Sequence, residues 1–367
     1  MYYKVKIKIL HGRREKMKDN SVLIAMSGGV DSSVTALLLK EKGYICEGAT
    51  MILKENASRD ADDAASVAAL IGIPFSSVDF SKEFRDKVVS KFVSVYENGG
   101  TPNPCVDCNK HIKFGLLLDY ADKKGLRYLA TGHYAKIEYD GEKNRYLLKK
   151  AEDRSKDQSY FLYTLTQETL SRVLFPLGGI AKSEIREIAA KNGFVNARKH
   201  DSQDICFIPD GDYASFLERF NGKPYPAGDF LDINGNKIGT HLGAVRYTAG
   251  QRKGLGIAMG TPVYVCKKDM INNTVTVGPE EELFSDTLIA SGLNWISVEK
   301  PYDGMRVKAR ARYRHVEQDA TVYIIAEDKI KVVFDMPQRA LTAGQALVMY
   351  DGDTVIGGGT ITETPKR

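Results

Sequence analysis

Residues 21–33 read Ser-Val-Leu-Ile-Ala-Met-Ser-Gly-Gly-Val-Asp-Ser-Ser, an apolar run followed at once by two glycines and a helical pattern. Val22–Met26 is typical of a buried β-strand. Adjacent glycines let the backbone turn tightly and approach a ligand closely, and free N–H groups at the start of a helix favour phosphate oxygens. Hydroxyl donors are supplied by Ser27, Ser32 and Ser33. The stretch predicts a phosphate-binding loop, and the alternative is a plain glycine turn capped by Ser27 or Asp31.

Around this stretch, apolar runs of strand length alternate with helical patterns up to about residue 135. The predicted strands are Val22–Met26, Cys46–Ile52, Phe75–Val78 and Tyr128–Thr131. The predicted helices are Ser33–Lys42, Ala61–Ile71, Glu83–Tyr96 and Asn109–Lys124. Such alternation predicts an α/β fold with a doubly wound parallel sheet. A P-loop of the GxxxxGK[ST] type is excluded, because the loop has no lysine.

The rest of the chain divides into segments that differ in residue composition and hydrophobic pattern. Helices are predicted at Gln158–Arg172 and Lys182–Asn192, and after about residue 213 frequent Gly, Pro and Asn indicate a small, loop-rich domain. Short alternating strands then predict a small β-barrel or sandwich; they include Met305–Arg314, Ala320–Ala326, Ile330–Phe334, Ala346–Tyr350 and Thr354–Thr360. The predicted parts are a basic N-terminal extension (1–20), a catalytic α/β domain (21–212), a small central domain (213–285) and a C-terminal β-barrel (286–367).

Composition narrows the class of protein. The 367 residues are 43% hydrophobic and 27% charged, as in a folded domain, and no apolar run has the roughly 18 residues of a membrane span. The first twenty residues lack the apolar region of a secretory signal, and five cysteines show no disulfide framework. We therefore expect a cytoplasmic protein with free thiols. Residues 1–20 carry the whole net charge of +5; residues 1–16, which precede Met17, are either an upstream-start artefact or a disordered arm.

A second constellation is the loop Thr101–Lys110, which reads Thr-Pro-Asn-Pro-Cys-Val-Asp-Cys-Asn-Lys. Two prolines stiffen it, and Asn109 or Asp107 is a candidate cap for the following helix. Cys108 would then lie near a helix N-terminus, where the dipole and Lys110 lower a thiol pKa. Another thiol, Cys206, follows about a hundred residues later and is either reactive or a buried structural cysteine. Structural roles are expected for Cys46 and Cys266, which lie in apolar strand patterns.

Six motifs in this order carry a resemblance: SGGVDSS (27–33), TPNPxxxCNK (101–110), ATGHY (130–134), KDQSYFLY (156–163), ICFI (205–208) and GQRKGLGI (250–257). From Ser21 to its end, the chain resembles the bacterial tRNA-specific 2-thiouridylases, the MnmA family of PP-loop ATP pyrophosphatases. The resemblance implies a PP-loop ATPase domain, a small central domain and a C-terminal β-barrel. It implies an enzyme, a tRNA-uridine 2-sulfurtransferase that uses ATP and Mg²⁺. The wobble uridine's C2 oxygen is adenylated and replaced by persulfide sulfur, giving 2-thiouridine, AMP and pyrophosphate.

The resemblance also assigns residues. Cys108 would be the nucleophile and Cys206 the persulfide carrier, and the two would end as a disulfide. The implied ATP site is Ala25, Met26, Ser27, Gly28, Gly29, Val30, Asp31, Ser32, Met51 and Gly132. The target base would lie against Asn103, Pro104 and Cys105. The implied tRNA contacts are His133, Lys156, Asp157, Gln158, Arg312, Tyr313 and Gln345. No metal-ligating residue is implied.

The implied partners are the tRNAs for lysine, glutamate and glutamine and a persulfide donor such as a cysteine desulfurase or relay protein. Neither a membrane nor DNA is expected. The chain departs from the best-known members at Cys105, where they carry aspartate. We expect that no carboxylate base is essential here and that Cys105 mainly shapes the base pocket.

The residues alone allow two interpretations of each of two basic segments. Arg310, Arg312 and Arg314 would share one face of a strand as a phosphate stripe, or blunt a solvated edge strand. The basic segment 250–256 suits close approach to RNA, or is a surface turn. Two other functions stay open: an iron–sulfur-dependent tRNA thiolase with Cys105, Cys108 and Cys206 as cluster ligands, and a non-catalytic tRNA-binding protein with zinc on Cys105 and Cys108.

Overall fold

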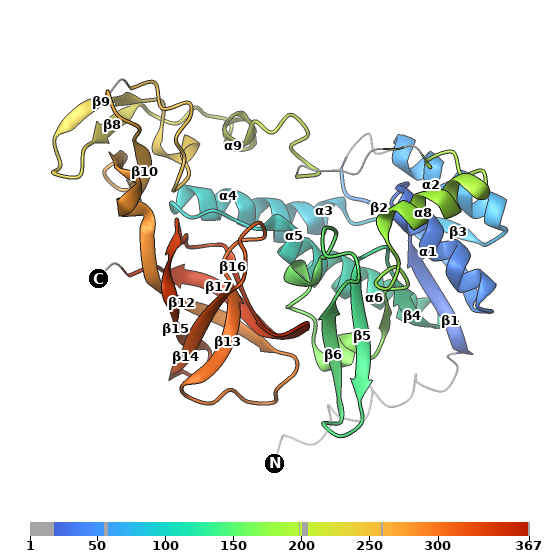
Figure 1. Ribbon diagram of the computed structural model, residues 1–367. Helices are drawn as coiled ribbons and strands as arrows, with labels where there is room; N and C mark the ends of the chain where they lie inside the picture. Colours follow the sequence, from blue (N-terminus) through green and yellow to red (C-terminus); the bar gives the residue numbers. More distant parts are fainter. Residues whose placement is uncertain (1–17, 55–57, 198, 200–204, 258–259, 366–367) are drawn as a thin grey trace, which may run out of the picture.

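The computed structural model describes residues 18–54, 58–197, 199, 205–257 and 260–365. Figure 1 shows three parts: an α/β layer structure, a small domain at the upper left and a β-barrel below it. The predicted N-terminal extension lies almost wholly outside the described residues.

The α/β part is built on a parallel sheet with the strand order β3-β2-β1-β4-β7. Its strands are β1 (Lys18–Ala25), β2 (Ile45–Ile52), β3 (Phe75–Asp79), β4 (Leu126–Ala130) and β7 (Val173–Leu174). The chain winds outward from β1 in one direction and then returns to add β4 on the other side. This order confirms the predicted doubly wound fold, and it puts a topological switch point between β1 and β4.

Helices cover both faces of this sheet because its central strands are apolar on both sides. Val22 and Ile24 of β1 pack in one core with α1 (Val30–Glu41), α2 (Ser58–Ile71) and α8 (Lys182–Lys191). Leu23, which points to the opposite face, belongs to a second core with α6 (Leu117–Lys123). Period-two alternation along β1 thus anchors both helical layers.

Two longer helical runs lie beyond β3. The first consists of α3 (Ser81–Phe84), the π-helical segment η1 (Arg85–Val89) and α4 (Ser90–Glu97), and it runs toward the small domain in Figure 1. The second consists of α5 (Pro104–Asp107), the π-helical segment η2 (Cys108–Leu116) and α6. Both runs contain the helices predicted for these regions.

The predicted helix Gln158–Arg172 is wrong. The segment holds only a short 3-10 turn, η3 (Ser159–Phe161), and the four-residue helix α7 (Gln167–Leu170) before β7. The carboxylate of Asp157 accepts hydrogen bonds from Ala151 N and Ser159 N, at 3.0 and 3.3 Å, and so stabilises a turn instead. Local bonds of this kind compete with helix formation.

The C-terminal part confirms the predicted barrel. Six antiparallel strands follow the order β12-β15-β14-β13-β16-β17, and pairing of β17 with β12 closes the cylinder. Their bounds are β12 (Phe284–Trp295), β13 (Met305–Arg310), β14 (Gln318–Ala326), β15 (Lys329–Arg339), β16 (Ala346–Asp351) and β17 (Thr354–Glu363). Closure leaves few free sheet edges.

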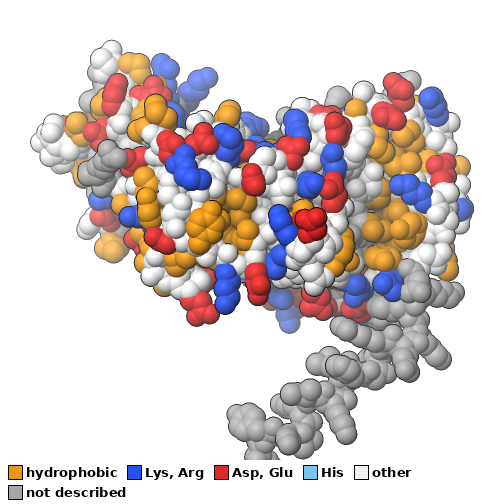
Figure 2. Space-filling view, turned by 60° about the horizontal axis from the view of Figure 1, so that its bottom comes forward, with side chains coloured by type: hydrophobic (Ala, Val, Ile, Leu, Met, Phe, Trp, Pro, Cys, Tyr) orange, Lys and Arg blue, Asp and Glu red, His pale blue; other side chains and the backbone are white. Residues whose placement is uncertain are grey.

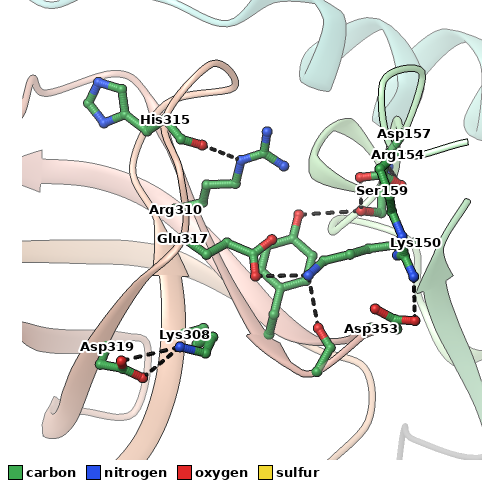
Figure 3. Close-up of polar contacts among 12 residues, drawn as sticks. Lys150, Arg154, Asp157, Ser159, Lys308, Arg310, His315, Glu317, Asp319 and Asp353 are labelled. Carbon is green, nitrogen blue, oxygen red and sulfur yellow. Dashed lines mark hydrogen bonds and ion pairs between the residues drawn. The ribbon is translucent and has the colours of Figure 1, made fainter.

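A hairpin that the sequence analysis did not predict joins the barrel to the α/β part. Its strands are β5 (Ala135–Asp140) and β6 (Arg145–Lys150), and β6 pairs with β17 at Lys149 and Thr354. Figure 3 shows the polar contacts here: the ammonium of Lys150 donates to Glu317 and to Gly352 O, each at 2.8 Å. Both side chains of this ion pair are largely buried.

The small central part has its own four-stranded sheet with the order β10-β11-β8-β9. Its elements are α9 (Tyr213–Asn221), β8 (Gly228–Leu231), β9 (Lys237–His241), η4 (Ala244–Arg246), β10 (Tyr264–Asp269), β11 (Thr274–Gly278) and η5 (Glu280–Leu283). It contacts the end of α4, where the rings of Tyr96 and Tyr213 stack with centroids 4.8 Å apart.

The surface agrees with the charge balance outside residues 1–20. On the face seen in Figure 2, Lys and Arg side chains are interspersed with Asp and Glu side chains. Within the described part of the chain, no helix is long and apolar enough to cross a membrane.

Candidate nucleotide and thiol site

The glycine-rich loop lies at the carboxyl end of β1, at the switch point of the sheet. β1 ends at Ala25, Met26 N donates to Ala49 O at 2.8 Å, and α1 begins at Val30. Gly28 has a φ of +71°, and a Cβ there would lie 2.3 Å from the carbonyl oxygen of Asp60. Only glycine fits this turn without displacing the backbone of α2.

Serine hydroxyls hold the loop in shape. Ser32 Oγ accepts a hydrogen bond from Ser27 N at 3.2 Å and donates to Gly29 O at 3.0 Å. Ser33 Oγ donates to the same carbonyl at 3.1 Å. These hydrogen bonds hold the loop in the turned conformation that an anion site at a helix start requires.

The turn after β4 packs against this loop. A Cβ on Gly132 would lie 2.9 Å from Asp31 C and from Ser32 N, so only glycine allows the two turns to touch. Met51, at the end of neighbouring β2, is half-buried and packs against the core beneath the loop. The structure thus brings Ala25–Ser32 together with Gly132.

Residues that the sequence analysis missed surround the loop. Lys182 Nζ binds both carboxylate oxygens of Asp31, at 2.7 and 2.8 Å, and Tyr134 OH donates to Oδ1 of Asp31 at 2.7 Å. Asn196 Nδ2 donates to Gly28 O at 3.0 Å. Tyr134 belongs to the ATGHY motif, but Lys182 is 151 residues from Asp31 and no pattern links them.

The three thiols Cys105, Cys108 and Cys206 lie close enough together to affect one another's pKa values. Cys108 and Met51 pack against one apolar cluster, which Phe207 also contacts. The ammonium of Lys54, just beyond β2, donates to the carbonyl oxygen of Cys206 at 3.1 Å. The end of β2 thus connects the loop region to the thiols.

The predicted activation of Cys108 is wrong. The helix begins at Pro104, so Cys108 lies beyond the first turn, where the helix dipole has little effect. Burial raises the pKa of Cys108 to about 12, and the opposing charge is that of Lys113 rather than Lys110. Burial also raises the pKa of Cys105 and that of Cys206, although both residues reach solvent, and Lys113 opposes both shifts.

Neither predicted cap acts as one. Asp107 forms an ion pair with Lys91 at 2.6 Å, and Asn109 Nδ2 donates to Phe161 O at 3.0 Å. Cys46 is buried, as expected for a structural cysteine, and Cys266 is half-buried. Among the residues with described positions, no group of three or more His, Cys, Asp or Glu side chains could hold a metal ion.

The loop before Cys105 is held by the barrel. Gln345 Nε2 donates to Thr101 O and Pro102 O, at 3.0 and 3.2 Å, and Thr101 N donates to Ala343 O at 2.9 Å. Asn103 and Pro104 follow this anchored stretch and lead into α5. Gln345 therefore positions the loop in this conformation.

Several side chains assigned to tRNA contacts point inward. The ring of His133 is buried between Phe114 and Phe175, bonds to Thr131 Oγ1 at 2.7 Å, and has a pKa well below its usual value because of burial. Asp157 is buried in its turn, and Gln158 Oε1 accepts from Tyr134 N at 3.0 Å. Lys156 is half-buried at the same turn.

The predicted arginine stripe is wrong, because β13 ends at Arg310 and the chain turns. The guanidinium of Arg312 donates inward to Ala340 O and Thr342 Oγ1, at 2.7 and 2.6 Å. Arg310 donates to the carbonyls of Tyr313 and His315. Tyr313 OH donates to Asp157 O at 3.2 Å, which links this barrel turn to the 156–158 segment.

Comparison with protein families gives three adjoining matches. Residues 20–210 match the tRNA methyl transferase HUP domain, residues 214–279 the tRNA methyl transferase PRC-barrel domain, and residues 285–361 the aminomethyltransferase beta-barrel domain.

Curated relatives match nearly the whole chain. The tRNA-specific 2-thiouridylase MnmA of Acetivibrio thermocellus is 47% identical over 358 residues, which cover 94% of this chain and 100% of that protein. MnmA 1 of Caldanaerobacter subterraneus is 49% identical, covering 94% and 98%. Among solved structures, the U34-tRNA thiolase NcsA of Methanococcus maripaludis is 19% identical with a TM-score of 0.36, covering 57% of this chain and 69% of that one. That structural likeness is too slight to support an argument.

Proposed function

The chain belongs to the tRNA-specific 2-thiouridylase family, and on that basis we propose how its residues act. It is an ATP-dependent tRNA sulfurtransferase that replaces the C2 oxygen of the wobble uridine with sulfur. The observation that carries the residue assignments lies at the end of β2: Met51 packs against the same apolar cluster as Cys108, and Lys54, just beyond the strand, donates to Cys206 O. ATP chemistry and sulfur chemistry would meet at one edge of the sheet.

The nucleotide would occupy Ala25–Ser32, with Met51 and Gly132 lining the adenosine side. Uridine O2 attacks the α-phosphorus of ATP, a P–O bond forms, and pyrophosphate leaves with the electron pair of the broken bond. Asp31 is the only carboxylate of the loop, but Lys182 Nζ binds both of its oxygens, so the hard oxygen ligands that the loop itself would offer to Mg²⁺ are the serine hydroxyls. When bound there, Mg²⁺ would neutralise part of the phosphate charge.

The sulfur step would use two thiols. The terminal persulfide sulfur of Cys206 reaches C2 as hydrosulfide when the thiolate of Cys108 attacks the Cys206 sulfur, and AMP then leaves C2. Cys108 and Cys206 finish as a disulfide, which an external dithiol must reduce. Removal of the proton from Cys108 is the demanding part, since burial opposes the thiolate.

The tRNA would present its wobble base unstacked, against Asn103, Pro104 and Cys105. Lys156, Gln158 and Tyr313 are the proposed direct contacts. We propose that the inward-facing His133, Asp157 and Arg312 instead shape the surface that tRNA contacts. Gln345 would hold the loop before Cys105, against which the target base lies. The proposed substrates are the lysine, glutamate and glutamine tRNAs, the sulfur donor is a cysteine desulfurase or relay protein, and the setting is the cytoplasm.

The test is incubation of the full chain with ATP, Mg²⁺, unmodified tRNA and a persulfide donor. Mass analysis of the tRNA should find 2-thiouridine, formed together with AMP and pyrophosphate. Cys206→Ser should end 2-thiouridine formation, and the matched control Cys46→Ser should preserve it. ADP and phosphate as products would contradict the ATP chemistry, and thiolation by Cys206→Ser would contradict the persulfide role.

A further inference from the structure

Lys182 is a buried cation beside the glycine-rich loop. The residue is 7% exposed, and its ammonium lies 2.7 and 2.8 Å from the two carboxylate oxygens of Asp31. The same ammonium lies 5.6 Å from the ring centre of Tyr134, whose hydroxyl also binds Asp31. A buried lysine is costly unless its charge is paired, so this arrangement needs an explanation.

The fold holds Lys182 firmly in this place. It is the first residue of α8, which packs against α1 in the core shared by Ile185 and Val34. Its backbone N–H donates to Asp153 Oδ2 at 3.2 Å. The ammonium therefore reaches the loop from the first residue of a helix that packs in the core.

The charges in and around the glycine-rich loop indicate what this cation does. Between Ala25 and Ser33 the only charged side chain is Asp31, which by itself would repel the phosphates of ATP. A second lysine, Lys199, approaches Gly28 O at 3.3 Å, but its ion pairs, at 2.8 Å each, are with Asp60 and Asp63 of α2, outside the loop. Among the residues that the structure describes, Lys182 is thus the cation whose ion-pair partner belongs to the loop itself.

We propose that Lys182 is the phosphate-binding cation of this site and that Asp31 and Tyr134 position it. It would supply from α8 the charge that the lysine of a GxxxxGK[ST] loop supplies from within the loop. The inference rests on the proposed function, because it takes ATP to bind at residues 25–32. As the α-phosphorus bond to pyrophosphate breaks, the lysine charge would stabilise the phosphate oxygens that gain negative charge.

The test measures binding without tRNA, by calorimetry, for ATP, pyrophosphate, AMP and adenosine. Lys182→Met should weaken ATP binding about ten- to a hundredfold, the usual effect of losing a charged hydrogen bond, and leave adenosine binding unchanged. Lys182→Arg, which keeps the charge, should recover most of the loss. Lys191→Met, at the exposed far end of the same helix, is the matched control and should bind ATP normally.

Each result of the binding measurements has a distinct meaning. Loss of pyrophosphate binding supports a contact to the leaving group, and loss of AMP binding supports a contact to the α-phosphate. ATP binding by Lys182→Met at the wild-type level overturns the proposal, as does an equal loss of adenosine binding, which would indicate a purely structural role. A wild-type protein that binds ATP but forms no 2-thiouridine would contradict the proposed function and leave the role of Lys182 intact.

Discussion

The thiol of Cys108 should be unusually unreactive in the free protein, and Lys113 should limit this effect. Burial raises its pKa from an ordinary 9.0 to about 12, and the charge of Lys113 is the main opposing influence. Cys105, Cys206 and the negative charge of Asp107 each add to the shift, while Lys54 acts on Cys206. The decisive change is therefore Lys113→Met, which removes the opposing charge.

The magnitude follows from the pKa difference. Three pKa units correspond to about a thousandfold smaller thiolate fraction at pH 8 than in an ordinary cysteine, because only the thiolate reacts. The rate should rise about tenfold per pH unit up to pH 10 without levelling, whereas an ordinary thiol levels near its pKa. Lys113→Met should slow the reaction further at every pH.

The assay is the rate of alkylation by iodoacetamide between pH 7 and pH 10.5, followed at the Cys108 peptide by mass spectrometry. A short peptide containing the same residues is the reference for an ordinary thiol. Lys110→Met is the matched control, since Lys110 is exposed and adjacent but does not set the pKa of Cys108. Restricted access would lower the rate equally at all pH values, so the shape of the profile isolates the pKa.

Levelling of the Cys108 rate near pH 8 would refute the reasoning, because it would mean that the thiol is activated in the free protein. Equal effects of Lys113→Met and Lys110→Met would refute the part assigned to Lys113. If the profile rises as expected, thiolate formation must be coupled to a later event, and repeating the measurement with bound tRNA would locate it.

Three further outcomes are expected. Gly132→Ala should lower ATP affinity about tenfold or more, because its methyl group would lie 2.9 Å from the backbone of the phosphate loop. The control Gly141→Ala places its methyl group where nothing lies within 4 Å, so it should bind ATP normally in the same calorimetric titration. Glu317→Gln should lower the free energy of unfolding by about 2 kcal/mol, since it removes a charged partner from a largely buried lysine, whereas Asp319→Asn breaks an exposed pair and should cost less than about 1 kcal/mol in denaturant titration. Cys105→Ser should retain 2-thiouridine formation within about tenfold, or roughly 1.4 kcal/mol of barrier; an inactive variant together with iron in the purified wild type would favour the iron–sulfur reading.

The sequence predicted the sheet and its glycine-rich loop because neighbouring residues determine both. The strand Val22–Met26, the glycines after it and the helix that follows are adjacent in sequence, so period and turn chemistry define them together. The barrel was predicted because its strands alternate between apolar and polar residues, although the pairings of β12 with β15 and β17, and of β13 with β16, join strands that are distant in sequence. The Gln158–Arg172 segment failed because the carboxylate of Asp157 fixes a turn, a side-chain effect that apolar spacing does not reveal.

Residues that meet through the tertiary fold could not be predicted in this way. Lys182 reaches Asp31 because α8 packs on α1, and Arg312 turns inward because β13 ends two residues earlier. In both cases the residue type is visible in the sequence, while its partner is set by packing between distant segments. Resemblance to a family identified the motifs, but it did not indicate which assigned side chains are buried.

The lysine that lowers the pKa of Cys108 is Lys113 and not the predicted Lys110. The sequence predicts a helix over Asn109–Lys124 with Cys108 near its start, which makes Lys110 the cation expected to act on the thiol. The helical run instead begins at Pro104 and is π-helical from Cys108 to Leu116, so that the residue five positions later is hydrogen-bonded to the first. That residue is Lys113, while Ile112 at the α-helical spacing is buried in the apolar cluster beneath. The charge of Lys113 lowers the pKa values of Cys105, Cys108 and Cys206, whereas Lys110, only two residues after Cys108, is exposed.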